Sequence, residues 1–250
     1  MKITYIGHAT CLIEIAGKRI LTDPIWANRI FFIKRLHKPG LELEKVLPVD
    51  LVLLSHAHFD HFDSGTLKKI SKKTPVVCAK HIARLLKRRG FEHVYELDWL
   101  EQIEFLGLKI TALPAKHFGG RWQFWDRWLG FCSYMITSIK ETVYFAGDTA
   151  YFGAFKTLAE HFKIDAAILP IGAYQGPGRA DFRKVHMDPA QALNAFLDLK
   201  AKFFVPMHYD TYKLSVEPTG EPEAWLRDLA AKKDMEEKVK ILKPGDFFEL

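Results

Sequence analysis

The sequence predicts an α/β fold in which mixed β-sheets are covered by helices. Near the N-terminus, short apolar segments follow one another as in hairpins, whereas later segments alternate between strand-like and helix-like patterns. Hairpins build antiparallel pairs and strand–helix alternation builds parallel ones, so the two patterns together predict mixed sheets. With 250 residues, 48% of them hydrophobic, the chain can bury a substantial core. No segment requires a division, and we expect one domain over residues 1–250.

The first half of the chain begins with three predicted strands. They are ITYIG, TCLIEI and KRILTD, separated by short turns. A loop follows from about 24 to 49, and we expect the apolar side chains of IFFIKR at 30–35 to pack against the core. The run LVLLS at 51–55 predicts a buried strand. A helix, a strand and a basic helix are then predicted in SGTLKKISKK, PVVCA and KHIARLLKRRG.

In the second half, strands are predicted at 102–105, 108–114 and 131–138, with an aromatic insertion at 118–131. Strands and helices alternate thereafter. The predicted strands are VYFAG, AAILPI and KFFVPM, and the predicted helices are YFGAFKTLAEHF, DPAQALNAFLDL and PEAWLRDLAAKK. Asp188 followed by Pro189 is typical of a helix start, because it places a side-chain acceptor at the N-cap and proline at the first helical position.

Composition disfavours several classes of protein. No apolar run approaches the roughly 20 residues of a membrane-spanning helix, and MKITYIGHAT lacks a signal-peptide pattern, so we expect a cytoplasmic location. Cys11, Cys78 and Cys132 have no CxxC spacing, which predicts reduced core residues rather than disulfides or a thiolate zinc site. The formal net charge of +6 favours anionic partners.

A cluster of metal-binding side chains follows the predicted strand at 51–55. In the motif HAHFDH, His56 and His58 point to one side of an extended chain, and a turn can bring Asp60 and His61 beside them. Imidazole and carboxylate are ligands of Zn²⁺, and also of Mn²⁺ or Fe²⁺. A histidine-rich surface turn is the alternative interpretation. Asp63 is expected to cap the helix that begins near Ser64 rather than to bind metal.

Three further candidate ligands each follow an apolar strand. ITALPAK leads into His117, VYFAG into Asp148 and FFVPM into His208. If these strand ends converge with the HAHFDH turn, they complete two ion sites, with Asp148 able to bridge the ions. Their presence favours a metal site over a simple polar turn.

These motifs, in this order, resemble those of the metallo-β-lactamase fold superfamily. The matching segments are HAHFDH, PAKH, AGDT at 146–149 and PMH at 206–208. Further segments resemble the branch that contains N-acyl-phosphatidylethanolamine-hydrolysing phospholipase D and, as a second relative, the L-ascorbate-6-phosphate lactonases. They are IGHAT at 6–10, LTDPI at 21–25, ELDW at 96–99, YFAGDTAY at 144–151, LPIGAY at 169–174 and HMDP at 186–189. The similarity runs from about residue 5 to 212 and implies a four-layer αββα sandwich with two mixed sheets.

The resemblance also implies roles for individual residues. It makes His56, His58 and His117 ligands of a first ion. It makes Asp60, His61 and His208 ligands of a second ion, with Asp148 as the bridge. The ions are expected to be zinc, with manganese or iron as alternatives, and a hydroxide held between them would be the nucleophile. Catalytic roles are assigned to Asp60 and to His186, which would contact substrate or protonate the leaving group. His8 and Asp23 are left out of the ligand groups, and for both a structural role in holding loops near the site is favoured at least as much as a chemical one.

The leading functional hypothesis is a phosphodiesterase of the phospholipase-D-like branch that acts on a small-molecule or lipid-like anionic substrate. Arg121, Arg179 and Arg183 are candidate substrate contacts. The alternatives are a lactonase or other ester or amide hydrolase, a nuclease, and a non-catalytic metal-stabilised binding protein. Nucleic acid is disfavoured, because the basic helix at 80–89 is typical of a solvated face. The segment RWQFWDRW at 121–128 fits either a lid or a peripheral membrane contact. The oligomeric state stays open.

Overall fold

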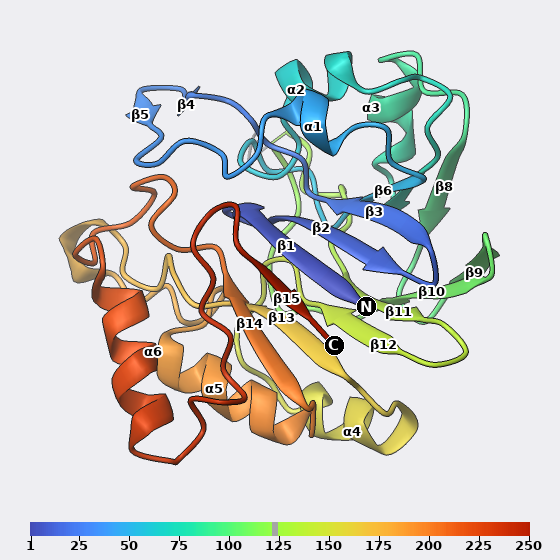
Figure 1. Cartoon of the computed structure of the whole chain (residues 1–250). Helices are drawn as coiled ribbons and strands as arrows, with labels where there is room; N and C mark the ends of the chain where they lie inside the picture. Colours follow the sequence, from blue (N-terminus) through green and yellow to red (C-terminus); the bar gives the residue numbers. More distant parts are fainter. Residues whose placement is uncertain (122–124) are drawn as a thin grey trace.

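Two mixed β-sheets face each other in the computed structural model, which describes residues 1–121 and 125–250 and, at Arg179, the backbone only (Figure 1). The first sheet has the strand order β15-β1-β2-β3-β6-β7-β8. Its strands are β1 (Lys2–Gly7), β2 (Thr10–Ile15), β3 (Lys18–Thr22), β6 (Leu51–Leu54), β7 (Val76–Ala79), β8 (Val94–Leu97) and β15 (Phe247–Glu249). Neighbours from β15 to β3 are antiparallel, whereas those from β3 to β8 are parallel.

The second sheet has the order β14-β13-β12-β11-β10-β9 and is also mixed. Its strands are β9 (Gln102–Phe105), β10 (Leu108–Leu113), β11 (Ser133–Thr137), β12 (Thr142–Phe145), β13 (Ala166–Pro170) and β14 (Phe203–Met207). The pairs from β9 to β12 are antiparallel, and β12, β13 and β14 run parallel. The prediction of two mixed sheets is confirmed.

Helices cover the outer side of each sheet (Figure 1). Those on the first sheet are α1 (Leu43–Val46), α2 (Ser64–Lys69) and α3 (Ala83–Lys87). Those on the second are α4 (Ala154–His161), α5 (Pro189–Asp198) and α6 (Glu221–Ala231), with a short 3₁₀ turn η1 at Pro177–Arg179. This gives the expected four-layer αββα arrangement. Among the described residues, no helix has the length and apolar character needed to cross a bilayer.

Helix starts follow the predicted capping chemistry. The Asp63 carboxylate accepts hydrogen bonds from the backbone N–H groups of Gly65 and Thr66, which caps α2. Asp188 and Gln191 form a reciprocal capping box at the start of α5, with Pro189 as the first helical residue. The helices themselves are shorter than predicted: α2 ends at Lys69 and α3 covers only Ala83–Lys87.

The segment predicted as a loop at 24–49 contains α1 and a small hairpin of β4 (Arg29–Ile30) and β5 (Ile33–Lys34). Ile30 is buried as expected, but Phe31 is 55% and Phe32 99% exposed. The expected packing of both phenylalanines against the core is therefore wrong. The physical reason is the two-residue turn of the hairpin, which places these two side chains at its tip, away from the sheets.

Buried side chains fill the space between the sheets, and all three cysteines lie among them, as predicted. Hydrogen bonds also join the sheets directly. The Tyr134 hydroxyl donates to the carbonyl oxygen of Leu54 at 2.9 Å, and the Cys132 N–H donates to that of Ser55 at 3.0 Å. These bonds hold the end of β6 against the start of β11.

The segments that follow β12 and β6 come into close contact where Gly147 meets Ser55. Gly147 has a φ of +57°, and a Cβ placed on it would lie 2.5 Å from the Ser55 Cβ. Glycine is therefore required here both for its backbone conformation and for the space.

We expect Gly147→Ala to lower the free energy of unfolding by about 2–5 kcal/mol, the sum of about 1–2 kcal/mol for the left-handed backbone and about 1–3 kcal/mol for overpacking. Gly107→Ala is the matched control, since Gly107 has a φ of +79° but open space around it. It should lose only the backbone contribution. Urea unfolding of the metal-free variants measures both, and equal losses would contradict the importance of the Ser55 contact.

Candidate metal centre

The candidate site lies where strands of both sheets end at a shared edge. In the first sheet β1, β3 and β6 run in one direction, and in the second β10, β12 and β14 do the same. The residues that follow these six strand ends come together. They are His8 after β1, Asp23 after β3, the HAHFDH turn after β6, His117 after β10, Asp148 after β12 and His208 after β14.

The first predicted ligand group, His56, His58 and His117, is brought together. The Nδ1 atom of His58 lies 2.9 Å from Nε2 of His56 and 3.2 Å from Nε2 of His117. One proton can satisfy only one of these nitrogen pairs, whereas a cation between the rings can accept a lone pair from all three. Burial lowers the pKa of both His58 and His117 to about 4, which keeps the rings in the neutral form that binds metal.

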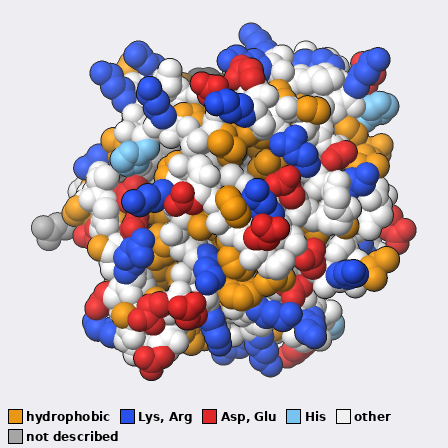
Figure 2. Space-filling model, viewed as in Figure 1, with side chains coloured by type: hydrophobic (Ala, Val, Ile, Leu, Met, Phe, Trp, Pro, Cys, Tyr) orange, Lys and Arg blue, Asp and Glu red, His pale blue; other side chains and the backbone are white. Residues whose placement is uncertain are grey.

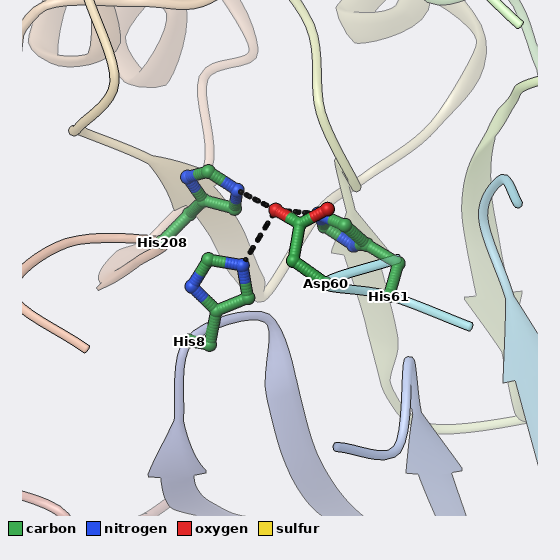
Figure 3. A group of neighbouring side chains, drawn as sticks. All are labelled: His8, Asp60, His61 and His208. Atoms are coloured by element: carbon green, nitrogen blue, oxygen red, sulfur yellow. Dashed lines mark hydrogen bonds and ion pairs between the residues drawn. The ribbon is translucent and has the colours of Figure 1, made fainter. Parts of the chain in front are cut away.

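The second predicted group also converges, and Figure 3 shows it around the Asp60 carboxylate. The Oδ2 atom of Asp60 lies 3.5 Å from Nε2 of His61 and 3.4 Å from Nε2 of His208. His8 joins this group, because its Nε2 lies 3.0 Å from the same oxygen. His8 therefore contacts a candidate ligand directly, as a residue that holds the site should.

Asp148 stands between the two groups. Its Oδ2 atom lies 3.3 Å from Nε2 of both His61 and His208, and 3.9 Å from Nε2 of both His56 and His117. The side chain is almost fully buried. A carboxylate placed in this way can contact ions in both groups, which is the bridging position that the sequence predicts.

Asp23 supports the site from behind. Its carboxylate lies 2.8 Å from Nδ1 of His61 and accepts hydrogen bonds from the N–H and hydroxyl of Ser55. A carboxylate on the far nitrogen of a metal-binding imidazole fixes its orientation and raises its basicity. The expectation that Asp23 holds the surroundings of the site agrees with these contacts.

The donor set fits metal ions. Among the described residues, several buried polar atoms of the site have no hydrogen-bond partner. They are Nε2 of His58 and His61, Nδ1 of His186, both ring nitrogens of His208, and Oδ1 of Asp148. Unpaired buried polar atoms are costly and rare, so a concentration of them indicates a site for a cation. Burial lowers the pKa of His208, but the nearby Asp148 carboxylate acts in the opposite direction, and the pKa of His208 is raised to about 9. A metal ion at this position would replace that proton.

His186 borders the cluster. Its Nδ1 atom lies 3.8 Å from Oδ2 of Asp148, and its ring packs against those of His117 and His208. The segment that carries it is tied to the site, because Nδ1 of His117 lies 2.8 Å from the carbonyl oxygen of Val185. Burial lowers the pKa of His186 to about 3, so a neutral ring faces the centre.

The three candidate substrate arginines lie in different surroundings. Arg183 is half-exposed, pairs with Asp181 and Asp188, and lines a cavity of about 430 Å³ together with Tyr174 and Trp225. Arg121 lies beside the HAHFDH turn and donates to the backbone carbonyl oxygens of Ala57 within it and of Phe62 directly after it. The side chain of Arg179 lies outside the described part of the chain, as do residues 122–124 of the aromatic segment.

Sequence reasoning left His8 out of the ligand groups, although its position next to Asp60 makes it a candidate contact of the second ion. A signal for it was present. His8 follows an apolar strand, as His117, Asp148 and His208 do, and the same rule applied to β1 would have selected it.

Comparisons with known proteins agree with this arrangement. Residues 18–209 match the family model described as a beta-lactamase superfamily domain. A metal-dependent hydrolase of Methanopyrus kandleri is 31% identical over the full length of both chains. N-acyl-phosphatidylethanolamine-hydrolyzing phospholipase D 1 of Caenorhabditis elegans is 30% identical over 94% of this chain and 71% of its own. The crystal structure of an isothiocyanate hydrolase from Delia radicum gut bacteria has the same fold, with a TM-score of 0.84 and 23% identity over 100% of this chain and 99% of its own. The chain therefore belongs to the beta-lactamase superfamily, as its motifs had indicated.

Proposed function

We propose that this metal-dependent hydrolase of the beta-lactamase superfamily is a dinuclear phosphodiesterase. The observation that carries the dinuclear part is the position of Asp148, whose carboxylate lies between two separate groups of metal-binding side chains. Phosphodiester cleavage is supported by the relative whose name describes a phospholipase D. The net charge of +6 agrees with an anionic substrate.

In this proposal, the chain's residues hold two divalent ions and orient the substrate. His56, His58 and His117 would hold the first ion, Asp60, His61 and His208 the second, and Asp148 would bridge them. Zinc is the expected metal, with manganese or iron as alternatives. When bound, such a pair of ions supplies a water of lowered pKa as nucleophile and stabilises charge on the substrate oxygen.

His186 would act on the substrate by hydrogen bonding. A neutral imidazole offers one N–H donor and one acceptor, and the pKa of His186, about 3, favours this form. We therefore prefer a substrate contact to protonation of the leaving group. The cavity of about 430 Å³ that Tyr174, Arg183 and Trp225 line is formed in part by residues 180–188, the segment that carries His186, and its volume would accommodate part of a small organic phosphodiester.

A lactonase or another ester or amide hydrolase is the alternative enzyme, since the same donor set serves those reactions. A nuclease ranks lower. On the face seen in Figure 2, Lys and Arg side chains are interspersed with Asp and Glu, whereas nucleic acid is bound by a stripe or patch of basic charge. A metal-stabilised binding protein is the alternative from outside the enzymes, and peripheral contact with a membrane stays a proposal.

The dinuclear proposal predicts close to two metal ions per chain after reconstitution with zinc. Asp148→Ala should lose most of the bound metal and the activity, because the carboxylate serves both ions. Asp98→Ala, which removes an exposed carboxylate paired with Lys80, is the control and should keep both. Elemental analysis of the purified variants measures this, and a wild-type content of one ion or none would contradict the dinuclear model.

A substrate panel separates the candidate activities. Bis(p-nitrophenyl) phosphate, a phosphorylated sugar lactone and N-acyl-phosphatidylethanolamine are assayed side by side with the zinc-loaded protein. We expect turnover of at least one of the two phosphodiesters, because two ions held by these residues would stabilise the attacking and the leaving oxygen of an in-line displacement at phosphorus. Turnover of the lactone alone would refute the phosphodiesterase. No turnover with both ions bound would favour the binding protein.

His186→Ala should lower kcat by about 10²-fold, the usual effect of removing a hydrogen-bond donor that meets charge developing on the substrate. Its metal content should stay that of the wild type. His161→Ala, which removes an exposed histidine at the end of α4, is the control for the loss of an imidazole and should change neither. If His186→Ala loses metal in proportion to activity, His186 is a ligand instead.

A further inference from the structure

Arg121 lies beside the candidate metal centre, on the segment that follows His117. Its side chain is partly buried, and its Nη1 atom donates to the carbonyl oxygen of Ala57 at 3.1 Å and to that of Phe62 at 2.9 Å. Ala57 separates His56 from His58, and Phe62 directly follows His61. A single guanidinium nitrogen therefore bonds to both ends of the turn that carries four of the candidate ligands.

The same guanidinium also packs on the aromatic residues of this turn. Its central carbon lies 4.1 Å from the ring centroid of Phe59 and 4.9 Å from that of Phe62. Inside the turn, the N–H groups of His61 and Phe62 both bond to the carbonyl oxygen of His58. The turn therefore has two hydrogen bonds of its own backbone, and Arg121 adds two more from a distant segment.

Described residues on both sides of Arg121 make close backbone contacts. Gly119 packs so tightly against the backbone of Leu129 that a Cβ on it would lie 1.6 Å from the Leu129 carbonyl oxygen. The Gly130 N–H bonds to the carbonyl oxygen of Lys80 at 2.7 Å. Gly119 lies two residues after His117, and Gly130 is bonded to the residue that follows β7, so contacts on both sides of Arg121 place it beside the turn.

We propose that Arg121 is a positioning residue that holds the turn from His56 to Phe62 in its metal-binding shape and couples it to His117. Hydrogen bonds from a charged donor are stronger than neutral ones, which suits this task. Burial lowers the pKa of Arg121 to about 10, so the group is still charged at neutral pH. The inference rests on the proposed function in that the turn is taken to bind metal, and it gives Arg121 a role other than the substrate contact predicted from sequence.

The test compares Arg121→Gln with Arg89→Gln in the full chain. Arg89 is a matched control, because its guanidinium also packs on Phe62, with 4.8 Å to the ring centroid, but donates to Ser64 and to the carbonyl oxygen of Leu85. Zinc affinity of the metal-free proteins is measured by competition with a chromogenic chelator. We expect Arg121→Gln to weaken zinc binding by about 10–100-fold, the usual effect of removing a group that orients metal ligands. Arg89→Gln should bind zinc as the wild type does.

Two further readouts separate positioning from other roles. Amide hydrogen exchange of the metal-free protein should become faster at His61 and Phe62 in Arg121→Gln, with the strands unchanged, and Arg121→Lys should be intermediate. Hydrolysis of bis(p-nitrophenyl) phosphate by Arg121→Gln should recover towards the wild-type rate at excess zinc.

Two outcomes would overturn the inference. In the first, Arg121→Gln binds zinc as tightly as the wild type but loses hydrolysis rate, and excess zinc does not restore it. This result would indicate that Arg121 contacts the substrate. Equal weakening in both variants would indicate a general packing effect. If the wild type itself binds no zinc, the proposed function fails, whereas the exchange rates at His61 and Phe62 still decide whether Arg121 holds the turn.

Discussion

The arrangement of the site depends on the buried carboxylate of Asp148, whose negative charge must be compensated by neighbouring groups. An ionised carboxylate removed from water is costly unless opposite charge or hydrogen-bond donors compensate for it. Here the compensation comes from imidazoles of both sheets, with His61 and His208 at 3.3 Å and His56 and His117 at 3.9 Å. These rings bring further lone pairs into the same buried space, and divalent cations satisfy both demands together. The buried carboxylate and the surrounding lone pairs therefore favour a metal centre over an ordinary packed core.

The fold brings these imidazoles to Asp148 because strands of both sheets end at one edge. A side chain that follows a strand is placed by the strand's register, which packing and hydrogen bonds fix on both sides. Direct contacts between the sheets reduce the remaining freedom. The Cys132 N–H bonds to Ser55, the His208 N–H bonds to His8, and Gly147 leaves room for Ser55. Candidate ligands that are far apart in sequence are therefore held at the ends of strands that hydrogen bonds fix within and between the two sheets.

Much of this could be predicted from sequence, for identifiable reasons. Apolar strands that end in His117, Asp148 or His208 show both the strand and the residue at its end, and Asp63 and Asp188 cap helices through local chemistry. The elements that were missed are short or depend on distant partners. β15 has three residues and pairs with β1 from the other end of the chain, and the exposure of Phe31 and Phe32 follows from a hairpin turn without a glycine signal. The contact of His8 with Asp60 likewise requires two segments that only the fold brings together.

The sheets and the segments that follow them contribute differently to substrate specificity. Proteins that share this fold act on chemically different substrates by name, among them an isothiocyanate and a phospholipid, so the fold alone does not select the substrate. The described segments beside the centre are the candidates for this selection: the β4–β5 hairpin, residues His117 to Arg121, and the segment from Tyr174 to Asp188. Each of these also contacts the ligand-bearing loops, through Phe31 on Phe59, Arg121 on the HAHFDH turn, and Val185 on His117. A substitution in these segments that alters substrate choice is therefore expected also to alter how firmly the candidate metal ligands are held, so substrate choice and metal affinity should vary together.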